Sequence, residues 1–109
     1  MMNNAIIVGR IVRDLELHET ENGAKVTELT LAVPRNFKNM EGQYDTDFIP
    51  CKLWNIIAEN TAEYCKKGDL VAIKGRLQSV TYEENEIKRT SIELIAEKVS
   101  FLSSKREAD

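Results

Sequence analysis

The stretch from Phe48 to Trp54 holds the side chains with the clearest capacity for chemistry. Successive side chains of a β-strand point to opposite faces. One face of a strand here would carry a small apolar row suited to a core: Ile49, Cys51 and Leu53. The other would carry Phe48, Pro50, Lys52 and Trp54, which include two aromatic rings and a cation. Such rings can stack on nucleic-acid bases while the lysine meets a phosphate. Burial of the rings in a subunit interface is the alternative.

Two other segments supply side chains of the same kinds. A predicted loop over residues 35–44 begins with Arg35, Phe37 and Lys38. A predicted strand over residues 70–82 carries Lys74, Arg76 and Tyr82 on one face. If the strands adjoin, four rings and about five cations share one side of the domain, as in single-strand binding grooves.

The overall charge does not by itself favour a polyanionic partner. The formal net charge is −3, which gives no general attraction to nucleic acid. The positive charge must therefore be concentrated on one surface. The acidic residues are expected mainly elsewhere, over residues 16–28, on the helix and over residues 83–86.

The sequence lacks the usual parts of a catalytic or metal site. His18 is the only histidine, and no Gly-rich phosphate loop or nucleophile elbow appears. Cys51 and Cys65 lack metal-ligand spacing and are expected to be reduced packing residues of a cytosolic protein. We therefore predict no enzyme, with no catalytic residue, no metal and no cofactor.

Length and composition predict one domain. The chain has 109 residues, of which 42% are hydrophobic, enough for a modest core. No apolar run approaches the ~20 residues that span a bilayer, and no secretion signal is visible at the N-terminus. We expect a cytoplasmic protein without membrane contact, with a domain at residues 1–103 and a short polar tail at residues 104–109.

Hydrophobic periodicity predicts five strands and one helix. The strands are expected at residues 3–12, 25–35, 47–57, 70–82 and 87–102, and the helix at residues 58–67. Three strands, a helix and two further strands are typical of the OB-fold. We therefore predict an all-β protein, a five-stranded, partly open Greek-key barrel with the helix between strands 3 and 4.

Several residues predict local features of these elements. Gly9 predicts a bulge or bend, and a change of parity at residues 96–98 predicts a bulge in the last strand. Pro34 should end the second strand, and Pro50 should mark an edge or a bulge. Gly68 is expected to stop the helix, with two lysines in its last turn. The first strand is apolar on both faces at residues 5–8, as expected of a strand that is covered on both sides.

Several stretches together carry a family resemblance. They are residues 4–10, 22–24, 29–33 with Arg35 and Phe37, 47–49 with Cys51 and Trp54, 58–59, 67–68, 75–78 and 96–102. In this order and spacing the chain resembles the bacterial single-stranded DNA-binding protein (SSB) family along nearly its whole length. The resemblance implies a homotetramer of OB domains that binds single-stranded DNA in replication, recombination, repair or DNA uptake. It implies base stacking on Phe37, Phe48, Trp54 and Tyr82. The candidate phosphate contacts are Arg10, Arg35, Lys38, Lys52, Lys74 and Arg76.

The chain also departs from the family pattern. The family usually has basic residues where this sequence has His18, Asn55, Ile56 and Val80, so weaker binding than that of a housekeeping member is expected. Residues 105–109 are too short and mixed in charge to resemble the acidic tail of the family, so tail-mediated replication partners are not expected. Two alternatives stay open: a weakly DNA-binding OB subunit that assembles with or modulates a fuller SSB or replication protein, and an OB domain for RNA or another ligand.

Overall fold

A computed structural model describes residues 1–104 of the chain. The elements in chain order are β1 (Ala5–Ile11), β2 (His18–Glu19), β3 (Lys25–Lys38), β4 (Tyr44–Trp54), α1 (Asn55–Tyr64), β5 (Leu70–Glu84) and β6 (Ile87–Ser103). Apart from Ser104, the predicted tail at residues 104–109 lies outside the described residues. The domain boundary at residue 103 stays a prediction.

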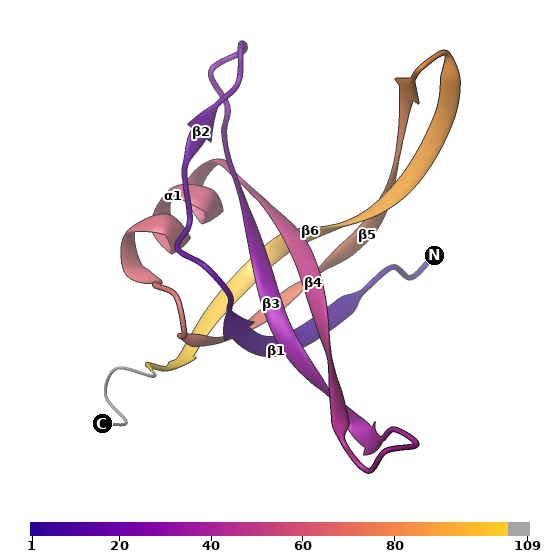
Figure 1. Ribbon diagram of the computed structural model, residues 1–109. Helices are drawn as coiled ribbons and strands as arrows, with labels where there is room; N and C mark the ends of the chain where they lie inside the picture. The colour runs from indigo at the N-terminus through magenta and orange to yellow at the C-terminus, as the bar shows by residue number, and fades with distance from the viewer. Residues whose placement is uncertain (105–109) are drawn as a thin grey trace.

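Five long strands form a closed barrel (Figure 1). Their order is β1-β5-β6-β4-β3, and a short pairing of β1 with β3 closes the circuit at Arg10–Ala32 and Ile11–Leu31. The join between β4 and β6 is parallel and equally short. β2 only adds two residues to the edge of β3. The predicted all-β OB-fold, with its helix between the third and fourth long strands, is confirmed, but the barrel is closed by the β1–β3 pairing and not partly open as predicted.

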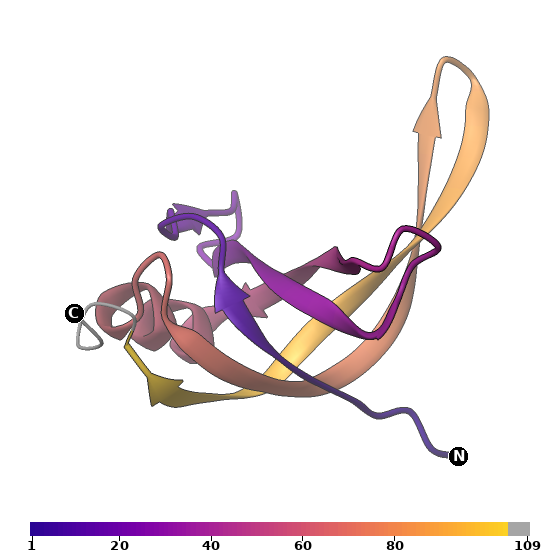
Figure 2. The same cartoon turned by 60° about the horizontal axis from the view of Figure 1, so that its bottom comes forward.

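The barrel core is formed by the inward side chains of alternating strand positions. The fully buried residues include Leu29, Leu31, Cys51, Leu53, Val71 and Ile73. α1 contributes buried Ala58 and Thr61 and covers one end of the barrel, while the β5–β6 hairpin extends away from the barrel (Figure 2). The core therefore fixes which side chains of β4 and β5 point outward. Among the described residues, no helix has the length and hydrophobicity needed to cross a bilayer.

Two glycines lie where the backbones of neighbouring strands approach closely. Lys74 aligns with Lys98 and Gly75 with Ala96, which leaves one extra residue on β6 and confirms the predicted bulge. A Cβ on Gly75 would lie 2.1 Å from the carbonyl oxygen of Ile95. Of the bulge or bend predicted at Gly9, the bulge is absent, because the β1–β5 register runs through this residue without a shift. Because Gly9 has no side chain, the backbone of β1 can lie close to that of β3.

β3 is longer than predicted. Pro34 aligns with Thr46, and the strand continues to Lys38, so the predicted loop over residues 35–44 is confined to residues 39–43. The missing N–H of Pro34 has a smaller effect than expected: the ladder becomes irregular after it but does not end. Pro50 aligns with Thr30 on β3 and lies one residue before the β4–β6 pairing begins, so one of its sides is an edge, as predicted.

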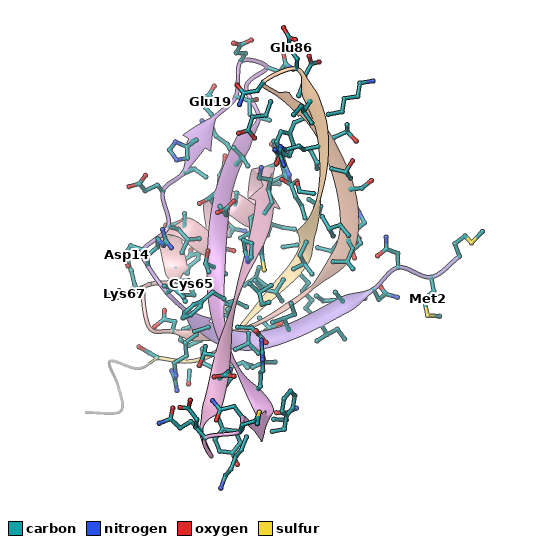
Figure 3. The ribbon with its side chains drawn as sticks, turned by 45° about the vertical axis from the view of Figure 1, so that its right-hand side comes forward. Met2, Asp14, Glu19, Cys65, Lys67 and Glu86 are labelled. Atoms are coloured by element: carbon teal, nitrogen blue, oxygen red, sulfur yellow. The ribbon has the colours of Figure 1, made fainter. Side chains whose placement is uncertain are left out.

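α1 covers residues 55–64, where the sequence predicted residues 58–67. The chain turns from β4 into the helix at Asn55, whose φ of +54° is a conformation that asparagine tolerates better than most residues. At the other end, the Asp69 carboxylate accepts a hydrogen bond from the backbone N–H of Lys66. Lys66 and Lys67 therefore follow the helix, and the prediction that they occupy its last turn with Gly68 as the stop is wrong. Figure 3 shows Lys67 beside Asp14, which accepts a hydrogen bond from its N–H at 2.9 Å.

The outward face of β1 is not covered within one chain. Ile6 is 71% exposed and Val8 is 47% exposed, although the apolar composition of this strand predicted cover on both faces.

Candidate nucleic-acid interface

The outward face of β4 presents two exposed rings with a cation between them. Phe48 is 62% exposed and Trp54 is 37% exposed, and Lys52 lies between them on the same face. The rings are six residues apart, which corresponds to about 20 Å along a strand. They would therefore contact different nucleotides of an extended strand.

The ring of Trp54 lies where three elements meet. Trp54 is the last residue of β4 and aligns with Val26 on β3. The next residue, Asn55, accepts a hydrogen bond at its side-chain oxygen from the backbone N–H of Lys25, at 3.2 Å. This bond ties the start of α1 to the start of β3 and holds the end of β4 in place.

β6 connects the outward face of β4 to that of β5. Lys52 aligns with Ile95 on β6, and Ile95 aligns with Arg76 on β5. The structure therefore brings Lys52 and Arg76, which are far apart in the sequence, onto one outward surface.

The same face of β5 continues onto the projecting hairpin, where Tyr82 is 45% exposed and aligns with Arg89 on β6. Figure 3 shows Glu86 at the tip of this hairpin. Sequence reasoning missed Arg89 because no face was assigned to the start of β6. The sequence held part of the signal, since Asn85 favours a tight turn. In the structure Asn85 and Glu86 both have positive φ, and this two-residue turn fixes the register that pairs Tyr82 with Arg89.

We call this surface the candidate face, and define it by Phe48, Lys52, Trp54, Arg76, Tyr82 and Arg89. It spans the outward sides of β4, β6 and β5.

The cations of the candidate face have carboxylate neighbours. The Nζ of Lys52 lies 3.3 Å from Oε2 of Glu93. Two longer contacts join Arg76 to Glu97 at 3.7 Å and Arg89 to Glu84 at 3.8 Å. The sequence placed the acidic residues mainly elsewhere, but the barrel folds these carboxylates among the cations. Positive charge is thus present on the face but largely offset.

Arg35 does not join the candidate face. Its Nη2 lies 2.8 Å from Oδ1 of Asp47, and its Nη1 lies 3.7 Å from Oδ2 of Asp45. Asp47 precedes Phe48 in β4, so it points to the opposite side of the strand. The hydrogen bond from Arg35 holds the pKa of Asp47 below its ordinary value and raises the pKa of Arg35 itself.

Two other candidate cations lie beside the candidate face. Arg10 on β1 aligns with Ala32 on β3, and Ala32 in turn aligns with Phe48 on β4. The guanidinium of Arg10, however, donates a hydrogen bond to the carbonyl of Gly68 at 3.0 Å. Lys74 aligns with Ile6 on β1, so its nearest neighbours include the exposed apolar residues of that strand.

The β3–β4 hairpin carries a further aromatic group. Phe37 is 66% exposed, and the Nζ of Lys38 lies 5.8 Å from the centroid of the Tyr44 ring. Tyr44 is a ring that the sequence analysis did not select, because the segment was interpreted as a loop. Its alignment with Lys38 depends on the irregular register beyond Pro34.

The two cysteines are placed for packing. Both side chains are buried, and burial raises the pKa of both thiols, that of Cys51 to about 11. Neutral, inaccessible thiols are poor nucleophiles and poor metal ligands. In the part of the chain that the structure describes, no cluster of three His, Cys, Asp or Glu side chains could hold a metal ion.

Comparisons with known proteins concern the family to which the chain belongs. Residues 2–102 match the model of the single-strand binding protein family. The chain is 47% identical over 107 residues to single-stranded DNA-binding protein 3 of Listeria innocua, covering 97% of this chain and 67% of that protein. It is 43% identical over 106 residues to single-stranded DNA-binding protein B of Bacillus subtilis, covering 96% and 94%.

A third relative, the single-stranded DNA-binding protein of Halalkalibacterium halodurans, is 47% identical over 103 residues, covering 94% of this chain and 61% of that protein. The chain therefore spans nearly the whole Bacillus subtilis protein but only about two thirds or less of the other two. The family match covers almost every described residue, and the chain belongs to the single-strand binding protein family, a family of binding proteins and not of enzymes.

Proposed function

We propose that this protein binds single-stranded DNA without sequence preference and protects it in replication, recombination, repair or DNA uptake in the cytoplasm. The observation that carries the proposal is the pair of exposed rings on β4, Phe48 and Trp54, with Lys52 between them. Each base stacked on such a ring is worth roughly 1–3 kcal/mol, and stacking tolerates any base. The names of the relatives, which are single-stranded DNA-binding proteins, support the same function.

The proposed contacts follow the outward surface of the barrel. Bases stack on Phe48, Trp54 and Tyr82, with Phe37 on the β3–β4 hairpin as a further ring. The proposed phosphate contacts are Lys52, Arg76, Arg89, Lys38, Lys74 and Arg10. Arg35 is the weakest candidate, because two carboxylates already surround its guanidinium.

Fluorescence titration tests this function directly. Trp54 is the only tryptophan, so oligo-dT that stacks on it should quench the emission, and added salt should reverse the quenching. The logarithm of the association constant should fall with the logarithm of salt concentration by about 0.7 for each neutralised phosphate. Absence of quenching at low salt would contradict the proposal. Stronger competition by oligo-U than by oligo-dT would favour an OB domain for RNA.

We also propose that the protein works as a homo-oligomer, specifically a homotetramer. The outward face of β1 exposes Ile6 and Val8, and the strand pairs with β3 only at its last two residues. Its other residues thus keep one unpaired edge next to an exposed apolar face, a combination that proteins usually cover. Sedimentation equilibrium should give four times the mass of one chain, and a monomer at micromolar concentration would contradict this proposal.

A second candidate function is supported by the electrostatics. Because carboxylates offset the cations of the candidate face, the protein could serve as a weakly DNA-binding subunit that assembles with a fuller SSB or replication protein. Mixed oligomers on co-expression with such a protein, together with feeble oligo-dT binding by the pure chain, would favour this function. Tight binding by the pure chain would rule against it.

A further inference from the structure

Lys52 lies at a hollow in the centre of the candidate face. The hollow has a volume of about 250 Å3 and lies between β4 and β6. Its lining includes Lys52, Ser91, Glu93 and Glu28. Its β4 residues, Pro50 to Lys52, lie between Phe48 and Trp54, so a strand that follows β4 from one ring to the other passes over it.

Two carboxylates and one ammonium group line this hollow. Glu93 is 3.3 Å from the Nζ of Lys52, and Glu28 aligns with Lys52 across β3 and β4, where side chains on one face are direct neighbours. The side chains of Lys52 and Glu93 are only 30% and 29% exposed, so salt screens this pair less than it screens fully exposed charges. A phosphate that approaches Lys52 therefore meets an ammonium group that is already paired.

We propose that Glu93 is an internal competitor for the DNA phosphate: its carboxylate holds Lys52 in an ion pair that a phosphate must displace. Glu93 thereby lowers the affinity of the candidate face for single-stranded DNA and sets its value. Glu28 adds a second negative charge at the same hollow. This inference rests on the proposed function, because it concerns how strongly that function is exerted.

The substitution Glu93→Gln tests the competition with little change of shape. Removal of the carboxylate should tighten oligo-dT binding by roughly two- to fivefold, which is the range that corresponds to one partly exposed ion pair. Because Lys52 then becomes free to neutralise a phosphate, the salt dependence should steepen by about 0.7. Misfolding would weaken binding, so a gain in affinity for oligo-dT cannot be explained by misfolding.

Glu63→Gln is the matched control. Glu63 is exposed on α1, and its substitution removes one negative charge without touching the hollow. It should leave the affinity for oligo-dT unchanged. An equal gain in Glu63→Gln would show a general charge effect and would overturn the competition.

A second background separates ion pairing from simple repulsion. In Lys52→Gln, the further change Glu93→Gln should give a smaller gain and no steeper salt dependence, because no ammonium group remains to be released. A gain as large as that in the unmodified protein would overturn the inference.

The outcomes also separate this inference from the proposed function. If the unmodified protein binds oligo-dT and Glu93→Gln binds it equally, only the competition is refuted. If the unmodified protein does not bind and Glu93→Gln does, the competition is supported and the function proposed for the unmodified chain is refuted. If neither binds, both are refuted.

Discussion

Substitution of Phe48 by alanine separates binding from folding. Phe48 is 62% exposed, so only about a third of the residue is buried. Because full burial of a phenylalanine is worth about 1.5–3 kcal/mol, the variant should lose roughly 1 kcal/mol or less in the free energy of unfolding. Loss of one stacked base should cost about 1–3 kcal/mol of binding, or about 5- to 150-fold in Kd. The effect on binding should therefore exceed the effect on stability.

The assay is oligo-dT titration followed by the fluorescence of Trp54, which lies about 20 Å from Phe48 along β4 and so remains a valid reporter. The matched control is Phe101→Ala on β6. Phe101 is also half-exposed, at 51%, but it aligns with the core residue Val71 and is not on the candidate face. Unchanged affinity in Phe48→Ala, or an equal loss in Phe101→Ala, would refute the stacking argument.

Four further predictions concern stability, thiol reactivity and assembly. Gly75→Ala should lower the free energy of unfolding in urea by at least about 2 kcal/mol, since the added Cβ would meet backbone atoms of β6. Gly42→Ala should lower it by only about 1–2 kcal/mol, because Gly42 has open space around it and only its φ of +79° disfavours a side chain. Between pH 9 and 11 the free energy of unfolding should fall by at most about 2–3 kcal/mol, because the pKa of Cys51 is raised in the folded protein and the thiol of the unfolded chain therefore ionises first. Urea unfolding that is insensitive to pH over this range would contradict this prediction. At pH 8 a thiol reagent should titrate Cys51 and Cys65 only after unfolding, and rapid reaction of the native protein would show that the thiols are accessible. Ile6→Asp should dissociate the oligomer in sedimentation, and an intact assembly would place the interface elsewhere.

Local alternation was enough to predict the parts of the fold that depend on single strands. Ile49, Cys51 and Leu53 were assigned to the core, and Cys51 and Leu53 are fully buried, with Ile49 packed against the core. The change of parity in the last strand correctly located the extra residue of β6 near residue 97. In both cases the physical cause is the two-residue repeat of a strand, which is visible in the sequence.

The features that the sequence did not predict depend on contacts between distant segments. The ion pair of Lys52 with Glu93 joins residues 41 positions apart and exists because β4 and β6 pair in parallel. α1 starts three residues earlier than predicted, at Asn55, where the chain turns out of β4 in a left-handed conformation. Arg35 lies off the candidate face because β3 continues through it, so strand alternation puts it on the side of Val33, which aligns with Asp47 and not with Phe48.

The charge distribution is the most consequential of these differences. Composition alone required the positive charge to gather on one surface, and the cations do lie together on the candidate face. The sequence could not show that carboxylates from β6 accompany them, because the strand order of the barrel decides which charges become neighbours.

Photo-cross-linking tests most directly whether the outward face of β4 is the DNA contact. An oligonucleotide that carries 5-iodouracil is irradiated with the protein, and the adducts are mapped by mass spectrometry. We predict adducts at Phe48, Trp54 and Tyr82. Tyr64 on α1 is more exposed, at 70%, than any of these rings, and it lies off the candidate face. Adducts confined to Tyr64 or Phe101, with none on β4, would contradict the account.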